Sequence, residues 1–207
     1  MVRCTERDTR ISAILLAGGK SRRLGRDKAL ENLGGERIID RVIGKVAQCF
    51  SELIVVGDKP ERSQELNLAE QITFVHDVFE DAGSLGGLYT GLSKSSSDWC
   101  FVAACDMPFL SVDLLNDMKN KALASQSHVF IPTIDGRFQP THALYNKECL
   151  PHIERNIKLG ELKMIGYFDK VKVKTVEYRS VNMDEEVTRS FFNLNTEDDL
   201  KEARQWV

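Results

Sequence analysis

Apolar and polar positions follow one another in blocks over the first 125 residues, and the period of the blocks changes regularly. Short apolar runs of strand length occur at 11–16, 53–56, 72–76 and 99–105. Two other stretches, 38–50 and the residues after Ser111, have apolar side chains every three or four positions, as amphipathic helices do. The stretch 77–92 holds four glycines and is predicted to be a loop that enters a helix. Strands that alternate with helices predict right-handed βαβ units, and therefore a mainly parallel sheet in a three-layer, Rossmann-like α/β fold.

Past about Ser125 the pattern becomes less regular. The predicted elements there are strands at 128–132, 141–145, 171–178 and 191–194, and helices at 147–157 and 161–168. Thr196, with Asp199 three residues later, predicts a capping box at the start of a final helix. We interpret this part as the second half of the same domain, because no linker or repeat separates it from the first half.

Composition places this pattern in a globular chain. Of the 207 residues, 42% are hydrophobic and 29% are charged, which suits a packed core and a charged surface. No apolar stretch approaches the length of a membrane span, and the first ten residues lack the apolar run of a signal peptide. The five cysteines and four histidines show no metal-type spacing. We expect a cytoplasmic protein without a membrane partner, made of a polar lead-in, 1–10, and one domain, 11–207, whose halves are about 11–124 and 125–207.

The most distinctive stretch follows the first strand. Gly18 and Gly19 come directly after the apolar run, and backbone N–H groups can approach an anion closely where no Cβ intervenes. The next nine residues hold five cations on a chain of net charge −3: Lys20, Arg22, Arg23, Arg26 and Lys28. Such side chains form charge-assisted bonds with phosphate oxygens, so the stretch predicts a nucleoside triphosphate ligand. The alternative is a solvated loop or a nucleic-acid patch, but the interleaved glycines favour phosphate, and we expect no nucleic-acid partner.

Asp106 is the carboxylate that the pattern singles out. It ends the apolar run 99–105, and Pro108 breaks the strand two residues later. Ligands of parallel sheets bind at the carboxyl ends of the strands, so the loops after 16, 56, 76 and 104 are expected to converge there. Mg²⁺ takes one or two protein carboxylates and completes its shell with water and phosphate, so Asp106 is predicted to hold Mg²⁺. The alternative is that Asp106 only forms a turn.

Lys28 has an apolar pair after it, which anchors its stem while its head reaches the phosphates.

The pattern L-A-G-G-x-S-x-R-L-G-x-D-K-A-L at 16–30, with C-D-M-P at 105–108, resembles the signature of nucleotidyltransferases. Within that class it is most similar to the molybdenum cofactor guanylyltransferases (MobA-type). Leu24 stands where the family usually has methionine, and Ser84 replaces the proline of the family's G-P-L-x-G loop. The resemblance implies a nucleotide-diphospho-sugar transferase-like fold, with a nucleotide half before the acceptor half.

The resemblance also implies roles for individual residues. It places the nucleotide contacts at Leu16, Ala17, Gly18, Gly19, Lys28, Gly57, Asp77, Gly86 and Asp106. Catalytic roles fall on Arg22, Lys28 and Asp106, and Asp106 is the expected ligand of the cofactor Mg²⁺. On the acceptor side the expected contact is Asn195. Gly57 has the alternative of a strand-ending glycine, and Asn195 that of a helix cap. Which of Arg22 and Arg23 contacts phosphate stays open.

By this resemblance the reaction is the transfer of GMP from GTP to the phosphate of molybdopterin or molybdenum cofactor, with release of pyrophosphate. The pair Gly18-Gly19 favours GTP over CTP, because cytidylyl relatives typically have alanine at the first position. One alternative is a cytidylyl- or sugar-nucleotidyltransferase of the same fold, and another is a nucleotide-binding module without turnover. Retention of both Lys28 and Asp106 argues against the binding module. The sequence leaves open whether a cofactor-delivery protein is a partner.

Overall fold

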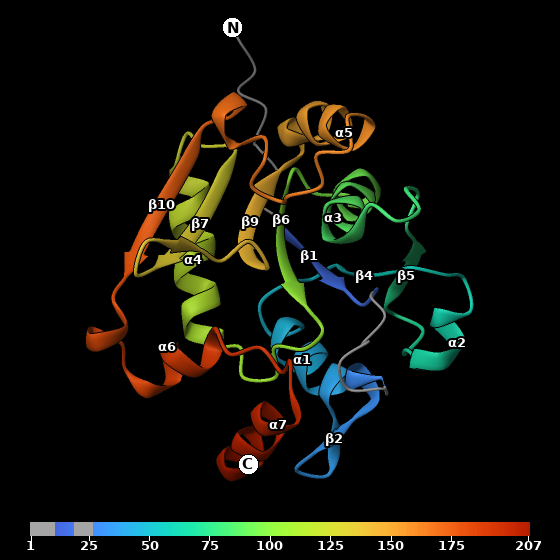
Figure 1. Ribbon diagram of the computed structural model, residues 1–207, viewed down its shortest axis with the longest axis vertical. Helices are drawn as coiled ribbons and strands as arrows, with labels where there is room; N and C mark the ends of the chain where they lie inside the picture. Colours follow the sequence, from blue (N-terminus) through green and yellow to red (C-terminus); the bar gives the residue numbers. More distant parts are fainter. Residues whose placement is uncertain (1–10, 19–26) are drawn as a thin grey trace, which may run out of the picture.

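A computed structural model describes residues 11–18 and 27–207 of the chain. Within these ranges, eight strands form one sheet in the order β10-β7-β9-β6-β1-β4-β5, and β8 pairs with β7 (Figure 1). The strands are β1 (Ile11–Leu16), β4 (Leu53–Gly57), β5 (Thr73–His76), β6 (Trp99–Ala104), β7 (Val129–Ile134), β8 (Arg137–Phe138), β9 (His142–Asn146) and β10 (Val173–Tyr178). A separate hairpin joins β2 (Asn32–Leu33) and β3 (Glu36–Arg37).

The sheet is mainly parallel. β1 pairs parallel with β4 and with β6, β4 with β5, and β7 with β10. β9 is inserted antiparallel between β6 and β7, and β8 is antiparallel to β7. All six residues of β1 are buried, as expected for a central strand covered on both faces.

Helices cover both faces of the sheet. The α-helices are α1 (Ile38–Val46), α2 (Arg62–Leu66), α3 (Gly83–Lys94), α4 (Val112–Ala124), α5 (Leu150–Lys158), α6 (Glu185–Ser190) and α7 (Glu197–Ala203). Short 3-10 turns form η1 (Lys28–Leu30), η2 (Lys147–Cys149), η3 (Phe168–Lys170), η4 (Ser180–Asn182) and η5 (Arg204–Trp206). Among the described residues, no helix combines the length and the apolar character needed to cross a membrane.

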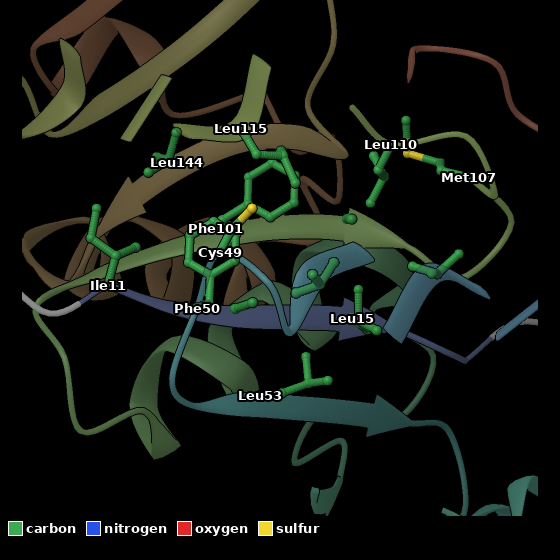
Figure 2. Close-up of a cluster of buried hydrophobic side chains, with 14 of the residues drawn as sticks. Ile11, Leu15, Cys49, Phe50, Leu53, Phe101, Met107, Leu110, Leu115 and Leu144 are labelled. Atoms are coloured by element: carbon green, nitrogen blue, oxygen red, sulfur yellow. The ribbon is translucent and has the colours of Figure 1, made fainter. Parts of the chain in front are cut away.

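Two apolar cores separate these layers. On one face, side chains of α1 and α4 pack on the sheet, and the rings of Phe50 and Phe101 stack at a centroid distance of 5.3 Å (Figure 2). On the other face, Leu85, Leu88 and Leu92 of α3 share a core with Ile153 of α5. The molecule is therefore a three-layer α/β structure with a mainly parallel sheet, and the predicted fold class is confirmed.

Most predicted elements are present with shifted ends. The helix expected over 38–50 ends at Val46, while α3 continues to Lys94, two residues past the stretch 77–92. Ser111 caps α4, since its side chain accepts the N–H of Leu114, and Thr196 with Asp199 forms the predicted capping box.

Two predictions in the second half were wrong. Residues 161–167 are irregular and turn structure that leads into η3, which begins at Phe168. Gly160, with φ of 74°, follows the end of α5, and Met164 and Tyr167 are buried in the core. Residues 191–194 do not form a strand. They are apolar because Phe191 packs on His142, at a ring distance of 4.4 Å, and Leu194 is buried in a separate apolar cluster.

Candidate functional site

The turns after the central strands meet at one edge of the sheet, as the sequence predicted. Ladder-like hydrogen bonds continue past the strand ends: the N–H of Cys105 donates to the carbonyl of Leu16 at 3.1 Å, and the N–H of Ala17 donates to the carbonyl of Val56 at 2.8 Å. The turns after β1, β4 and β6 are therefore held side by side. This edge is where parallel α/β sheets bind their ligands.

A cleft of about 580 Å³ opens between the ends of β1, β4 and β5 and the start of α3, and we call it the first cleft. Its volume is within the range of small-molecule sites. Its lining combines the ring of Phe79 with several polar side chains, among them Asp58, Lys59 and Asp77. Such a surface suits an aromatic group that carries hydrogen-bond donors.

A smaller cleft of about 230 Å³, the second cleft, shares Leu16, Gly18 and Ser84 with the first. It is also lined by Lys28 and Asp106. The two clefts are therefore continuous, and together they suit an elongated ligand with a neutral, ring-bearing end and an anionic end.

Asp106 lies in the second cleft, directly after β6. Among the described residues its Oδ1 has no hydrogen-bond partner, although that atom is buried. Burial raises the pKa of this carboxyl, and the opposing charge of Lys28 offsets the rise only in part. The backbone carbonyl of Asp106 accepts the N–H of Leu194 at 2.9 Å, which fixes the residue in place.

An unpaired buried carboxylate oxygen is costly, so the arrangement favours a bound cation or donor at this point. No group of three or more His, Cys, Asp or Glu side chains within 11–18 and 27–207 could hold a metal ion. Mg²⁺ does not need such a group, because it binds through one or two carboxylates and completes its shell with phosphate and water. Asp106 therefore has the chemistry of a Mg²⁺ ligand.

Lys28 connects the two halves of the molecule. It is the first residue of η1, which Asp27 caps by accepting the N–H of Ala29 at 3.1 Å. The Nζ of Lys28 donates to Oδ1 of Asn195 at 3.2 Å. The cap of α7 is Thr196, so the side chain of Asn195 does not serve as the helix cap and instead faces Lys28.

Asp77 is held in place through one of its two carboxylate oxygens. Its Oδ1 accepts the hydroxyl of Thr90 at 2.7 Å and the N–H of Phe79 at 3.1 Å. A Cβ on Gly86 would lie 2.8 Å from Oδ2 of Asp77, so glycine is required there to leave the carboxylate in position. Gly86 thus lies beside Asp77, in the first turn of α3.

Gly57 has a packing reason of its own. A Cβ at this position would lie 2.6 Å from the ring of Phe74, so no larger residue fits without a rearrangement. Gly57 ends β4 and also lines the first cleft, so it is a strand-ending glycine, and its contact with a nucleotide stays a prediction. The predictions for Gly19 and Arg22 concern residues outside the described ranges.

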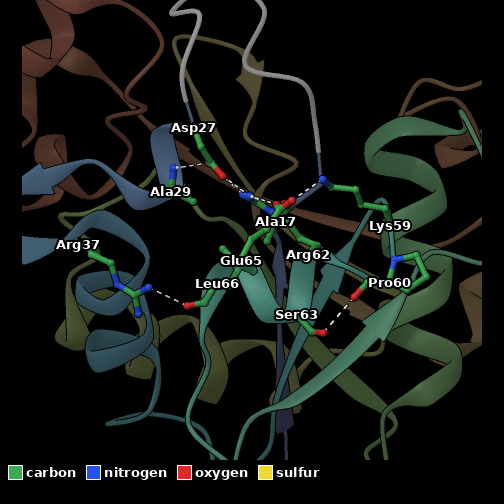
Figure 3. Close-up of polar contacts among 10 residues, drawn as sticks. All are labelled: Ala17, Asp27, Ala29, Arg37, Lys59, Pro60, Arg62, Ser63, Glu65 and Leu66. Atoms are coloured by element: carbon green, nitrogen blue, oxygen red, sulfur yellow. Dashed lines mark hydrogen bonds and ion pairs between the residues drawn. The ribbon is translucent and has the colours of Figure 1, made fainter.

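Arg62 was missed by the sequence analysis. It begins the five-residue helix α2, lines the second cleft and is only 8% exposed. Its Nε donates to the carbonyl of Ala17 at 3.1 Å, and its other nitrogens bind Asp27 (Figure 3). A signal for it did exist, because Arg62 follows the carboxyl end of a buried strand, but a helix of one turn has no detectable period.

Comparison with known proteins gives a consistent result. The family described as the MobA-like NTP transferase domain matches residues 13–171. A probable molybdenum cofactor guanylyltransferase from Natranaerobius thermophilus is 32% identical over 197 residues, covering 95% of this chain and 96% of its own length. A molybdenum cofactor guanylyltransferase from Desulfosudis oleivorans is 29% identical and covers 93% of this chain and 94% of its own length.

The fold agrees with these relationships. The crystal structure of molybdopterin-guanine dinucleotide biosynthesis protein A from Archaeoglobus fulgidus superimposes with a TM-score of 0.82 at 28% identity, over 95% of this chain and 98% of that one. The family match covers more than half of the chain and includes the turns that form both clefts. This chain belongs to the MobA-like NTP transferase family and is a nucleotidyltransferase, as its sequence signature predicted.

Proposed function

We propose that this chain transfers GMP from GTP to the phosphate of molybdopterin or molybdenum cofactor and releases pyrophosphate. Family membership supports nucleotidyl transfer, and relatives named molybdenum cofactor guanylyltransferases support the guanine nucleotide and the acceptor. The observation that carries the proposal is the unpaired carboxylate oxygen of Asp106 beside Lys28 in the second cleft.

In this proposal the nucleoside of GTP occupies the first cleft and its phosphates occupy the second. Oδ2 of Asp77 accepts a hydrogen bond from the nucleoside, because Thr90 and Phe79 already bind Oδ1. The ring of Phe79 lines the same cleft and offers an apolar surface to the base. The ammonium group of Lys28 binds a phosphate oxygen, and the N–H groups near Gly18 approach the phosphates where no Cβ intervenes.

Asp106 would hold Mg²⁺, which when bound neutralises charge on the phosphates. The chain supplies little covalent chemistry of its own. Its contribution is to align the acceptor phosphate with the α-phosphorus for in-line attack and to stabilise the developing charge. Asn195 contacts Lys28 from the second half of the chain, and this contact supports Asn195 as the proposed residue on the acceptor side. Its amide can donate to the acceptor phosphate while its oxygen accepts from Lys28.

The proposal is tested by pyrophosphate release with GTP, CTP or ATP, each supplied with molybdopterin and Mg²⁺. We expect release with GTP to exceed release with the other two nucleotides by at least about tenfold, with a guanine dinucleotide as the second product. Equal release with CTP would remove the guanine assignment and leave a nucleotidyltransferase of other specificity. Binding of GTP without any release, in the presence of acceptor and metal, would contradict the proposed reaction.

A further inference from the structure

Arg62 is a buried arginine between two segments that carry the proposed phosphate site. Its Nε donates to the carbonyl of Ala17, just past β1, and its Nη2 donates to Oδ1 of Asp27 at 3.0 Å. Its Nη1 pairs with Oδ2 of the same aspartate and lies 3.2 Å from Oε2 of Glu65. Figure 3 shows the guanidinium between Ala17 and Asp27. Every nitrogen of this guanidinium therefore has a partner within the protein.

The two groups that Arg62 joins stand at either end of the cation-rich stretch in the sequence. Ala17 precedes it, and Asp27 is followed directly by Lys28. The planar guanidinium fork binds both oxygens of Asp27, an arrangement that fixes direction as well as distance. The ammonium group of a lysine is a single point of charge and cannot reproduce that fork.

The carboxylate held by Arg62 also starts the segment that carries Lys28. Oδ1 of Asp27 accepts the N–H of Ala29, which caps η1. Lys28 is the first residue of η1, and its Nζ contacts Asn195 across the second cleft. A shift of Asp27 would therefore move the backbone of Lys28 and the reach of its ammonium group.

We propose that Arg62 is a positioning residue: by binding Ala17 and Asp27 together it holds η1 so that Lys28 points at the phosphates of the bound nucleotide. This inference rests on the proposed function, because it takes a triphosphate to be the ligand of the second cleft. Arg62 acts through Asp27 and Lys28, since each nitrogen of its guanidinium already binds a group of the protein. An ion pair that only stabilises the fold would leave the contribution of Lys28 to phosphate binding unchanged. Loss of Arg62 should instead cancel that contribution.

The chain offers a matched control. Arg37 binds both oxygens of Asp40, at 2.6 and 2.8 Å, and donates to the carbonyl of Leu66 at 2.8 Å. Like Arg62, Arg37 binds both oxygens of one aspartate and one backbone carbonyl, although Arg62 contacts Glu65 as well. Neither Arg37 nor Asp40 lines the two clefts. Arg37→Lys therefore reports what the loss of such a fork does to the fold alone.

The experiment measures binding of inorganic tripolyphosphate and of GTP, by calorimetry, to the full chain and its variants. We expect Arg62→Lys to raise the Kd of tripolyphosphate about tenfold, as the loss of one well-placed contact would. In the Arg62→Lys background, Lys28→Ala should add less than about threefold, because Lys28 is no longer held in place. Arg37→Lys should leave the Kd within about twofold of wild type, even if it lowers the Tm as much as Arg62→Lys does.

A second variant keeps the test decisive if Arg62→Lys does not fold. Asp27→Asn retains an oxygen that caps η1 but removes the charge that pairs with Arg62, and it should weaken tripolyphosphate binding in the same way. The inference is overturned if a folded Arg62→Lys or Asp27→Asn binds tripolyphosphate within twofold of wild type. It is also overturned if Lys28→Ala retains its full loss in either background.

The two probes separate this inference from the proposed function. Wild-type protein that binds tripolyphosphate without preferring GTP over CTP would contradict the guanine assignment, and the tripolyphosphate series would still decide the role of Arg62. Wild-type protein that binds neither probe would contradict both.

Discussion

Each end of the central sheet holds a partly buried carboxylate, and the two carboxylates differ in the hydrogen bonds that they accept. At the amino end, Glu52 precedes β4 and accepts hydrogen bonds from the Ser12 hydroxyl and the Ser96 N–H, the latter at 3.0 Å. The hydroxyl of Ser95 lies 3.2 Å from the same carboxylate. At the carboxyl end, Asp106 follows β6, and its buried Oδ1 has no partner among the described residues.

The contrast extends to the protonation of the two groups. Burial alone would raise both pKa values. For Glu52 the hydrogen bonds from the serines outweigh burial, and the pKa is lowered. For Asp106 burial prevails over the charge of Lys28, and the pKa is raised. A structural carboxylate such as that of Glu52 receives its hydrogen bonds from the protein itself. A carboxylate that lacks such bonds at the ligand-binding edge is available for a ligand.

The largest effect should come from Asp106→Asn. The substitution keeps the shape and the turn, since Asn and Asp both suit such positions, but it removes the charge. Turnover should fall by roughly two to three decades, as when a key electrostatic group is removed from an active site. Steady-state pyrophosphate release measures this. Asp117→Asn, on the surface of α4, is the control and should keep wild-type turnover. Near-normal turnover in Asp106→Asn would make Asp106 a turn residue.

Lys28→Ala should have the next largest effect, and on binding more than on the fold. A charge-assisted contact of this kind contributes about 1.5–3 kcal/mol, or one to two decades in affinity for GTP. Calorimetry gives the Kd, and the Tm should change little because Asn195 is the one hydrogen-bond partner of the ammonium group within residues 11–18 and 27–207. Lys121→Ala on α4 serves as a control lysine. Unchanged affinity and turnover would mean that Lys28 is a surface residue.

Glu52→Gln should give the reverse pattern. It replaces a charged acceptor with an amide that offers one oxygen and two donors to the same serines, so the free energy of unfolding should fall by about 1–2 kcal/mol. For a chain of this length that corresponds to a fall in Tm of roughly 2–8 °C. Turnover per folded molecule should stay at the wild-type value. A loss of turnover without a loss of stability would show that the amino end of the sheet also serves the reaction.

The smallest effects should appear in the pH dependence of stability. The lowered pKa of Glu52 means that its contribution is present above the unfolded value of 4.5 and is lost as the pH falls through the folded value. The raised pKa of Asp106 has the opposite sign: the charged carboxylate destabilises the fold at neutral pH, and protonation at low pH relieves this.

Thermal melts of the two variants across pH test these signs. Asp106→Asn should be as stable as wild type or more stable at pH 7, and the difference should vanish toward low pH. The deficit of Glu52→Gln should be present at pH 7 and should shrink below about pH 4.5. A Glu52→Gln deficit that grows on acidification would contradict the account of that group.

Those parts of the molecule that depend on local pattern could be predicted from the sequence. The six-residue apolar run of β1 is buried throughout, and the turns after β1, β4 and β6 converge because parallel strands end at one edge. Asp106 could be identified because it ends such a strand. The family resemblance added Asn195, which no local pattern would have selected, and gave a role to Asp77, which follows the predicted strand 72–76.

The remaining features depend on contacts between distant segments. The antiparallel insertion of β9 between β6 and β7 is set by packing, and no periodicity encodes it. The contact of Lys28 with Asn195 joins residues 167 positions apart. Residues 161–168 and 191–194 were assigned to regular elements from their apolar positions. Some of these side chains, such as Tyr167 and Leu194, are buried in apolar clusters without a helix or a strand, while Leu162 is exposed.

We propose that Asp106, whose buried Oδ1 has no partner within the described residues, holds the divalent cation. Binding of Mn²⁺, as a paramagnetic substitute for Mg²⁺, can be titrated by electron paramagnetic resonance in the presence of a non-hydrolysable GTP analogue. We predict that Asp106→Asn weakens Mn²⁺ binding by at least about tenfold, whereas Glu52→Gln leaves it within twofold of wild type. A folded Asp106→Asn protein that binds Mn²⁺ as tightly as wild type would contradict the account.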